Sequence, residues 1–185
     1  MSNVDYAIQQ TVSQSTLQFI VYLKVNYSSS NGSNLSGTYD YSQSGTFALP
    51  SGGLSAFTDL IREGQTPTGG TPFPAGSIPV ITAPSYVVFA IGGPGNFRKN
   101  LDAVTTDDSV QGEYYNLTYV LDDGTTFPGN NLHTITYTDQ SPCHIMYFSA
   151  TSPSTKGQQG LPDDFNLYLN LGKIDPSVKN TGHGG

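Results

Sequence analysis

Apolar and polar residues alternate over much of this chain, with the period of two that is typical of β-strands. The clearest example is residues 16–27, in which one face is apolar and consists of Leu17, Phe19, Val21, Leu23, Val25 and Tyr27. The polar stretch 28–37 follows, and the alternation then resumes over residues 37–49. These patterns predict a long hairpin between 16–27 and 37–49, with the first five residues of that apolar face buried.

Several later segments also have strand patterns and lie between turn signals. Residues 85–91 are a continuous apolar run, which suits a strand buried on both faces. The pair Asp123-Gly124, at the end of the segment 112–121, is typical of a tight hairpin turn. The remaining predicted strands are 131–139, 143–150 and 164–174, and the last of them carries one apolar face of Phe165, Leu167, Leu169 and Leu171.

One short helix is predicted near residues 54–63, where Phe57, Leu60 and Ile61 share a helical face. Ser55 is a candidate cap at its start and Gly64 a candidate glycine at its end. The stretch 65–84 is rich in proline, which predicts a surface connection or an edge strand because proline cannot donate a ladder hydrogen bond.

The many short strands and the single helix together indicate the all-β class. We expect one antiparallel β-sandwich with Greek-key or jelly-roll connections. The length of 185 residues suits a single domain. We place that domain at residues 1–179 and expect a flexible C-terminal tail at 180–185.

The composition argues against some classes of binding partner. Only 11% of the residues are charged, with 7 Lys and Arg against 14 Asp and Glu, which gives a formal net charge of −7. Nucleic acid is therefore not expected as a partner, because neutralised phosphates supply most of that affinity. No apolar run is long enough for a membrane helix, so membrane insertion is not expected. The N-terminal residues lack the pattern of a signal peptide, which predicts a cytoplasmic protein, with leaderless release as the alternative.

The segment Gly92–Asn100 contains a glycine-rich turn followed by cations. Gly92, Gly93, Gly95 and Arg98 could form an anion-binding loop after the apolar strand. Its spacing matches neither common phosphate-binding motif, and Pro94 removes one N–H donor. A tight reversal between two elements is the preferred interpretation.

The acidic pair Asp122-Asp123 lies close in sequence to Asn130 and Asn131, and such oxygen-bearing side chains suit Ca²⁺. No EF-hand spacing is present, and solvated loop carboxylates explain the same residues. Calcium stays a candidate ligand, and no metal site is assigned. The single Cys143 is expected to be a buried, unreactive thiol, because the acidic chain offers no electropositive setting for a nucleophile.

The chain contains 12 Tyr and no Trp. Tyrosine offers apolar area with a hydroxyl group, which suits protein or sugar partners, although it also fills half-buried strand positions. The candidate ligand-binding residues are Tyr39, Tyr41, Tyr114, Asp122, Asp123, Asn130 and Asn131.

Three functions are compatible with these features. The first is a non-catalytic protein that acts through its surface, in self-assembly or in binding another protein. The second is a carbohydrate-binding module that uses loop Tyr, Asn and Asp. The third is a hydrolytic enzyme of unknown class. No catalytic residue is assigned and no cofactor is expected.

The closing segment LNLGKIDPSVKN, residues 169–180, resembles the last strand and Asp-Pro turn of small bacterial β-sandwich inclusion-body proteins. The resemblance is limited to this segment and does not extend to the N-terminal part of the chain. It implies no site residue.

Overall fold

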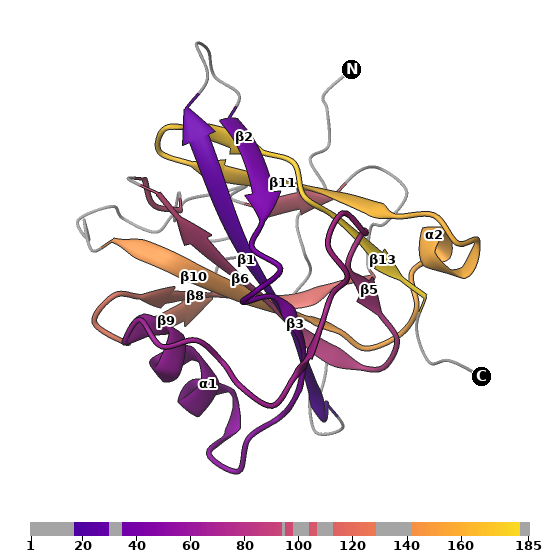
Figure 1. Ribbon diagram of the computed structural model, residues 1–185, viewed down its shortest axis with the longest axis horizontal. Coiled ribbons are helices and arrows are strands. Elements are labelled where there is room, and N and C mark those ends of the chain that lie inside the picture. The colour runs from indigo at the N-terminus through magenta and orange to yellow at the C-terminus, as the bar shows by residue number, and fades with distance from the viewer. Residues whose placement is uncertain are drawn as a thin grey trace.

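The computed structural model describes residues 17–29, 35–93, 95–97, 104–106, 113–128 and 142–181. The larger of its two sheets contains β1 (Phe19–Ser29), β2 (Leu35–Tyr39), β3 (Gly45–Ala48), β4 (Thr71–Pro72), β6 (Ser85–Gly92), β8 (Tyr115–Leu121), β9 (Thr126–Pro128) and β10 (Cys143–Ala150). The smaller sheet contains β5 (Val80–Ile81), β7 (Val104–Thr106), β11 (Asp163–Leu169), β12 (Gly172–Ile174) and β13 (Ser177–Asn180). Two helices, α1 (Gly53–Arg62) and α2 (Thr155–Gln158), complete the structure, so the predicted all-β class is confirmed (Figure 1).

The predicted N-terminal hairpin is confirmed with one interruption. β1 pairs antiparallel with β2, where Val25 faces Tyr39, and with β3, where Tyr22 faces Gly45. The change of register shows that residues 40–44 bulge out between the two pairings. The expected burial is confirmed at Leu17, Val21, Leu23 and Val25. It is wrong for Phe19, which is 39% exposed because it starts β1 at the end of the sheet.

The predicted purely antiparallel arrangement is wrong at the centre of the larger sheet. β6 pairs parallel with β1 over the whole of its length and antiparallel with β10. Parallel neighbours need a long connection. Here β2 and β3 run back along β1 to Phe19, and residues 49–84, which include α1, then lead to the start of β6 at the same end of the sheet. β6 is buried on both faces, as its continuous apolar run predicted. In the smaller sheet, β13 and β5 are also parallel.

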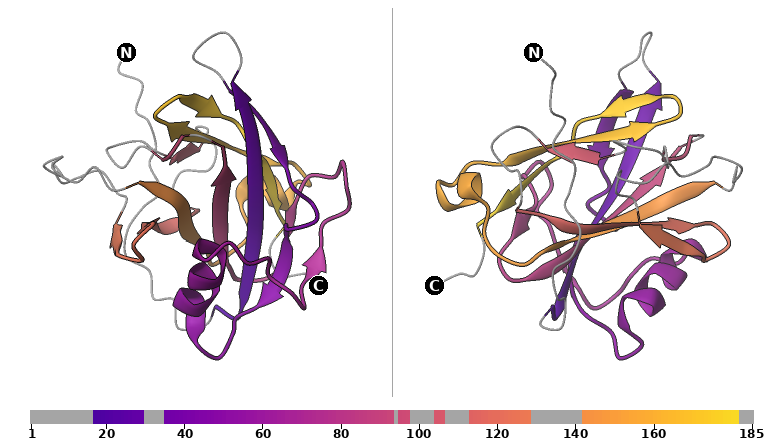
Figure 2. Two further views of the ribbon diagram at one scale, coloured as in Figure 1. Left: turned by 60° about the vertical axis from the view of Figure 1, so that its left-hand side comes forward. Right: turned by 180° about the vertical axis from the view of Figure 1, so that it is seen from behind.

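The larger sheet has a hydrophobic cluster on each face. The larger core lies toward the smaller sheet and includes Val21, Phe89, Phe148 and Phe165, so both sheets contribute to it. The smaller core lies on the opposite face, under α1, and consists of Ile20, Tyr22, Phe47, Phe57, Val88, Ala90, Val120 and Ile145. Figure 2 shows α1 on the side of the larger sheet that faces away from β11 and β13. Burial on both faces explains why Ile20 and Tyr22 interrupt the alternation of β1.

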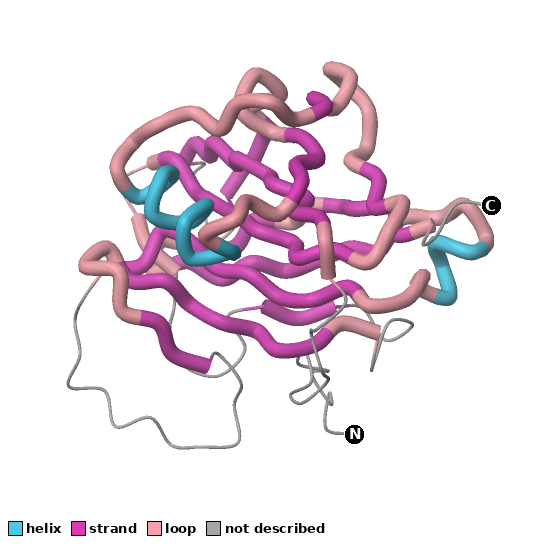
Figure 3. Tube along the Cα trace, turned by 90° about the horizontal axis from the view of Figure 1, so that it is seen from below, coloured by secondary structure: helices cyan, strands magenta, loops and turns pink. Residues whose placement is uncertain are grey.

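The predicted helix is confirmed as α1, which lies across strands of the larger sheet (Figure 3). Gly64 follows its end with a φ of 78°, a conformation that favours glycine. Ser55 is not the cap, because the N-cap is Gly52 and no side chain caps it. The second helix, α2, was not predicted. It is short and is capped by Ser154, whose Oγ accepts from the N–H of Gly157.

The C-terminal strand prediction needs two corrections. Residues 164–174 do not form one strand, because a tight turn at Asn170-Leu171 folds β12 back on β11 and leaves Leu171 47% exposed. β13 extends through Asn180, whose buried side chain donates to the Ser152 carbonyl, so the predicted tail cannot begin at that residue. Residues 182–185 and the predicted strand 131–139 lie outside the described residues.

Neither helix in the described ranges is long and apolar enough to cross a membrane.

Candidate ligand-binding groove

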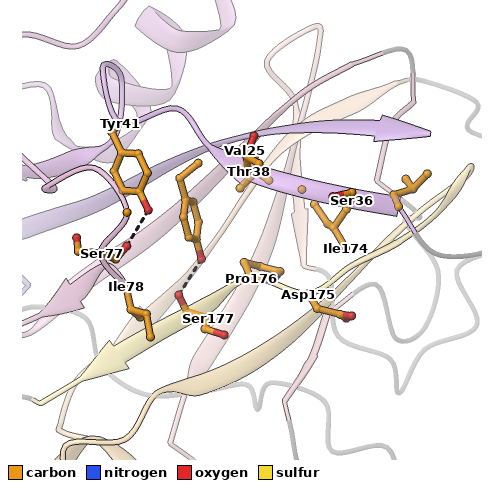
Figure 4. A pocket seen from close by; sticks show the side chains of 14 residues that line it. Val25, Ser36, Thr38, Tyr41, Ser77, Ile78, Ile174, Asp175, Pro176 and Ser177 are labelled. Carbon is orange, nitrogen blue, oxygen red and sulfur yellow. Dashed lines mark hydrogen bonds between the residues drawn. The ribbon is translucent and has the colours of Figure 1, made fainter. Parts of the chain in front are cut away.

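A groove of about 450 Å³ opens between β2 and the segment 174–177, which connects β12 to β13 (Figure 4). The loop 76–78 forms a further wall, and Tyr41 and Val25 contribute from their own segments. Val25 and Ile174 also belong to the larger core. The groove is therefore an open margin of that core, in the size range of ordinary ligand sites.

Two predicted ligand-binding residues, Tyr39 and Tyr41, lie together in this groove. The Tyr39 hydroxyl donates to the Ser177 carbonyl and the Tyr41 hydroxyl donates to the Ser77 carbonyl, each at 2.7 Å. The two rings meet edge to face, with centroids 5.9 Å apart. Both hydroxyls thus hold the walls of the groove together, and the rings supply apolar surface.

Burial raises the pKa of Tyr39 well above its ordinary value, and the negative charge of nearby Asp164 acts in the same direction. The phenol therefore stays protonated at neutral pH and keeps its donor role toward Ser177. Asp164 in turn accepts from the Ser177 hydroxyl at 2.6 Å, which fixes the start of β13.

Charge is sparse in the groove. Of the described residues that line it, only Tyr39, Tyr41 and Asp175 have titratable side chains. Asp175 Oδ1 lies 3.2 Å from Lys173 Nζ, and both side chains are at least partly exposed. The remaining lining is apolar, as at Ile78 and Ile174, or carries hydroxyl groups, as at Ser36 and Thr38.

The acidic pair Asp122-Asp123 lies elsewhere, at the predicted turn between β8 and β9. Asp122 Oδ1 is 2.8 Å from His144 Nδ1, and Asp123 Oδ1 accepts from the N–H of Thr125 at 2.8 Å. The Asp122 carbonyl accepts from Arg62 of α1, which places this turn on the helix side of the sheet. Within the described ranges, no three His, Cys, Asp or Glu side chains are grouped as metal ligands. Asn130 and Asn131 lie outside those ranges.

The third predicted tyrosine, Tyr114, is not a surface residue. Its ring packs edge to face against Phe148 and Phe165, with centroid distances of 5.3 and 5.1 Å. Its hydroxyl donates to Asp163 Oδ2 inside the larger core. Burial, followed by the charge of Asp163, raises the pKa of the phenol far above its ordinary value. Tyr114 is therefore not exposed for a ligand at the surface, which the sequence pattern did not reveal because one strand face has the same pattern whether it is covered or open.

The described part of the glycine-rich segment, residues 92–93 and 95–97, packs in part against Tyr27. The Gly95 N–H donates to the Tyr27 hydroxyl, and a Cβ on Gly93 would lie 2.6 Å from the Tyr27 ring. The next two N–H groups donate to Asn170 Oδ1 and to the Cys143 carbonyl. The N–H groups of residues 95–97 are therefore used within the chain, so Gly95 does not offer its N–H to an anion, and the anion loop otherwise stays a prediction. Arg98 lies outside the described residues.

Cys143 is fully buried, and its thiol lies 3.3 Å from the Val120 carbonyl and 3.2 Å from the Ile145 carbonyl. Burial among apolar residues is the setting of an inert thiol. The unreactivity of Cys143 stays a prediction, testable by comparing thiol labelling of the native and the unfolded chain.

Sequence reasoning identified Tyr39 and Tyr41 but missed the other walls of the groove. Ile78 lies in the proline-rich stretch 65–84, which was interpreted as a surface connection or an edge strand. Ile174 was interpreted as the end of a strand, and Asp175-Pro176 was noted only in the resemblance to a last strand and its Asp-Pro turn. The Asp175-Pro176 pair was the one available signal, because proline commonly marks a break between strands.

No protein-family model matches the chain, and neither the curated proteins nor the solved structures that were compared contain a match. The resemblance of residues 169–180 to inclusion-body proteins gains no support from these comparisons. The function must therefore be argued from the groove and its chemistry.

Proposed function

We propose that this protein is a non-catalytic binding protein and that the groove beside β2 holds its partner. The observation that carries the proposal is the joint placement of Tyr39 and Tyr41 in an open groove, as walls against apolar Ile78 and Ile174. Aromatic rings beside apolar pockets are the usual anchors of recognition. The sparse titratable groups of the lining support binding more than catalysis, which needs paired acids, bases or nucleophiles.

We also propose that the two sheets form a β-sandwich. The support is the larger core, to which both sheets contribute side chains. Greek-key or jelly-roll connections stay a prediction. In this arrangement the groove lies at one margin of the sandwich, where β2 and the β12–β13 connection diverge.

A neutral carbohydrate is the second candidate ligand. The hydroxyl side chains of Ser36 and Thr38 and the carboxylate of Asp175 could exchange hydrogen bonds with sugar hydroxyls, while tyrosine rings pack on the sugar face. Calcium is not part of this proposal, because Asp122 and Asp123 do not contribute to the lining.

The experiment that tests the groove uses two exposed residues of similar character. Ile78 is 42% exposed in the groove, and Leu161 is 49% exposed outside its lining. Arrays of peptides and of neutral glycans are probed with the wild-type chain, with Ile78→Glu and with Leu161→Glu. We expect Ile78→Glu to weaken the retained ligand by about tenfold or more, because a carboxylate would be desolvated in the contact.

Leu161→Glu is expected to bind like the wild type, since the same change is made away from the groove. A ligand that binds both variants equally well would place the site elsewhere. Failure of both arrays to yield a ligand sensitive to Ile78→Glu would also contradict the proposed function.

A further inference from the structure

The outer edge of β2 carries backbone groups without a strand partner. The N–H of Asp40 donates to the Lys24 carbonyl at 2.8 Å, one position beyond the facing pair Val25 and Tyr39. Lys24 and Asp40 are therefore a hydrogen-bonded pair of the ladder. Bonded and non-bonded pairs alternate along an antiparallel ladder, so the pairs Val25–Tyr39 and Tyr27–Gly37 are non-bonded. The N–H and C=O groups of Gly37 and Tyr39 therefore point away from β1, toward the groove. Within the described residues, no backbone strand pairs with this edge of β2.

The two end strands of the larger sheet, β4 and β9, have features that hinder pairing with a further strand, and β2 lacks them. β4 is short and contains Pro72, and β9 is short and contains Pro128. Shortness and proline are the devices by which natural sheets block unwanted pairing. β2, with the sequence LSGTY, carries no proline and no charged residue. Its open edge is therefore competent to accept another strand.

We propose that the groove binds an extended polypeptide segment of another protein, which adds to β2 as a further strand. This inference rests on the proposed function and names its ligand class. Backbone hydrogen bonds to Gly37 and Tyr39 would hold the segment, as in other cases of strand addition. Alternate side chains of the segment would pack on apolar Ile78 and Ile174.

Charge defines the chemistry of the segment further. The carboxylate of Asp175 lines the groove, while the described lining contains no cation. Lys173 lies 3.2 Å from this carboxylate and offsets part of its charge, so the formal net charge of −7 of the whole chain is the stronger argument. An acidic segment would be repelled, whereas a neutral or basic one would not. The expected ligand alternates apolar residues with neutral or basic residues and has no proline at the paired positions.

Position 37 allows a matched test of the backbone bond. A Cβ on Gly37 would lie 3.3 Å from Val25 Cγ1 and 3.4 Å from Ile174 Cγ2, and this crowding is the same in Gly37→Ala and Gly37→Pro. Only proline removes the outward N–H, and it leaves the ladder with β1 intact because that N–H does not face β1. Gly37→Ala therefore controls for the added Cβ, and Gly37→Pro adds to it the loss of the N–H and the bulk of the ring.

The probe is a displayed library of random peptides about seven residues long, the length of an ordinary strand, selected on the wild-type chain. We expect the selected peptides to bind Gly37→Pro about tenfold more weakly than Gly37→Ala, through loss of the backbone bond and the bulk of the ring. We also expect bound peptide to slow amide exchange at Gly37 and Tyr39, while Ser36 and Thr38 change little because they already pair with β1.

Equal binding to the proline and alanine variants, or no change of exchange at Gly37 and Tyr39, would overturn strand addition. The exchange measurement uses the wild-type chain, so it decides even when Gly37→Pro does not fold. A neutral glycan that binds instead, with sensitivity to Ile78→Glu, would refute this inference and leave the proposed function standing. Self-association that Gly37→Pro abolishes would make a second copy of the chain the occupant and would overturn the proposal of a different protein.

Discussion

The two faces of the larger sheet are covered in different ways. One face packs against the smaller sheet. Aromatic side chains of both sheets meet in the larger core, where the ring centroids of Phe89 and Phe165 are 6.2 Å apart. Among the described residues, α1 covers the smaller core on the other face, where the ring centroids of Tyr22 and Phe57 are 5.5 Å apart. Tyr86 and Tyr147 stay half-buried on that face, at the edge of the smaller core. A second sheet thus buries a continuous surface, whereas a single helix covers only part of one.

The difference also concerns polar groups. The larger core encloses the hydrogen bond between Tyr114 and Asp163, and it opens at one margin into the groove. On the helix side, Thr58 of α1 is buried beside the smaller core, and its hydroxyl donates within the same helix, to the Ser55 carbonyl at 3.1 Å. The sheet–sheet side therefore combines the main packing contribution with the binding surface, and the helix side contributes packing.

The largest expected effect is that of Phe165→Ala. This ring contacts Tyr114 and Phe148 at centroid distances of 5.1 and 5.3 Å and is fully buried between the sheets. We expect a loss of about 3–5 kcal/mol in the free energy of unfolding, because neither sheet can close around the cavity. Urea unfolding measures it. A loss below about 1 kcal/mol would show that this core is not tightly packed.

Phe57→Ala tests the helix side of the same sheet. We expect a smaller loss, about 2–3 kcal/mol, because α1 lies on the outside and can settle toward the sheet to fill part of the cavity. The same urea measurement applies. An effect as large as that of Phe165→Ala would remove the distinction between the two cores.

Tyr114→Phe tests how much the buried hydrogen bond between Tyr114 and Asp163 in the larger core contributes to stability. The substitution removes one donor to the buried carboxylate of Asp163 while it keeps the ring, so we expect a loss of about 1–3 kcal/mol. Tyr147→Phe on the helix side is the matched control. It should change stability by less than about 0.5 kcal/mol because Tyr147 is half-buried. Equal effects of the two substitutions would argue against a structural role for the buried hydrogen bond.

The smallest expected effect is the pH dependence that buried tyrosines produce. Burial raises the pKa of Tyr22 in the smaller core and of Tyr114 in the larger core. A raised pKa in the folded state keeps the full contribution to stability below the pKa of the unfolded phenol, about 10. The contribution declines at higher pH, as phenols of the unfolded chain release protons that the folded chain retains.

Urea unfolding between about pH 8 and about pH 11, a range that brackets the ordinary phenol pKa, measures this decline. Tyr22→Phe and Tyr114→Phe should each flatten it, because each removes one phenol whose pKa differs between the two states. Profiles that keep the wild-type slope in both core variants would show that these phenols do not govern alkaline stability.

Much of the secondary structure was predictable, since side-chain period and turn chemistry are local properties. The alternation over 16–27 located β1, the continuous apolar run located β6, and the Phe57–Ile61 face located α1. Gly64 and the Asp123-Gly124 turn ended their elements as expected. Two tyrosines of the groove were also identified, because tyrosine pairs on an alternating strand suit exposed or half-buried positions.

The amino-acid sequence by itself determined the segments of the long strands β1, β6, β8 and β10, and that the chain is too poor in cations to neutralise many phosphates. Only the tertiary structure decided which strands become neighbours, that β6 runs parallel to β1, and that Tyr114 is covered while Tyr39 borders a groove. The physical reason is that a period of two specifies a face but not what covers it, and backbone donors are the same at every residue. The groove exists because segments distant in sequence meet, with Tyr39 bonded to Ser177 and Tyr41 bonded to Ser77, and no local pattern encodes such a meeting.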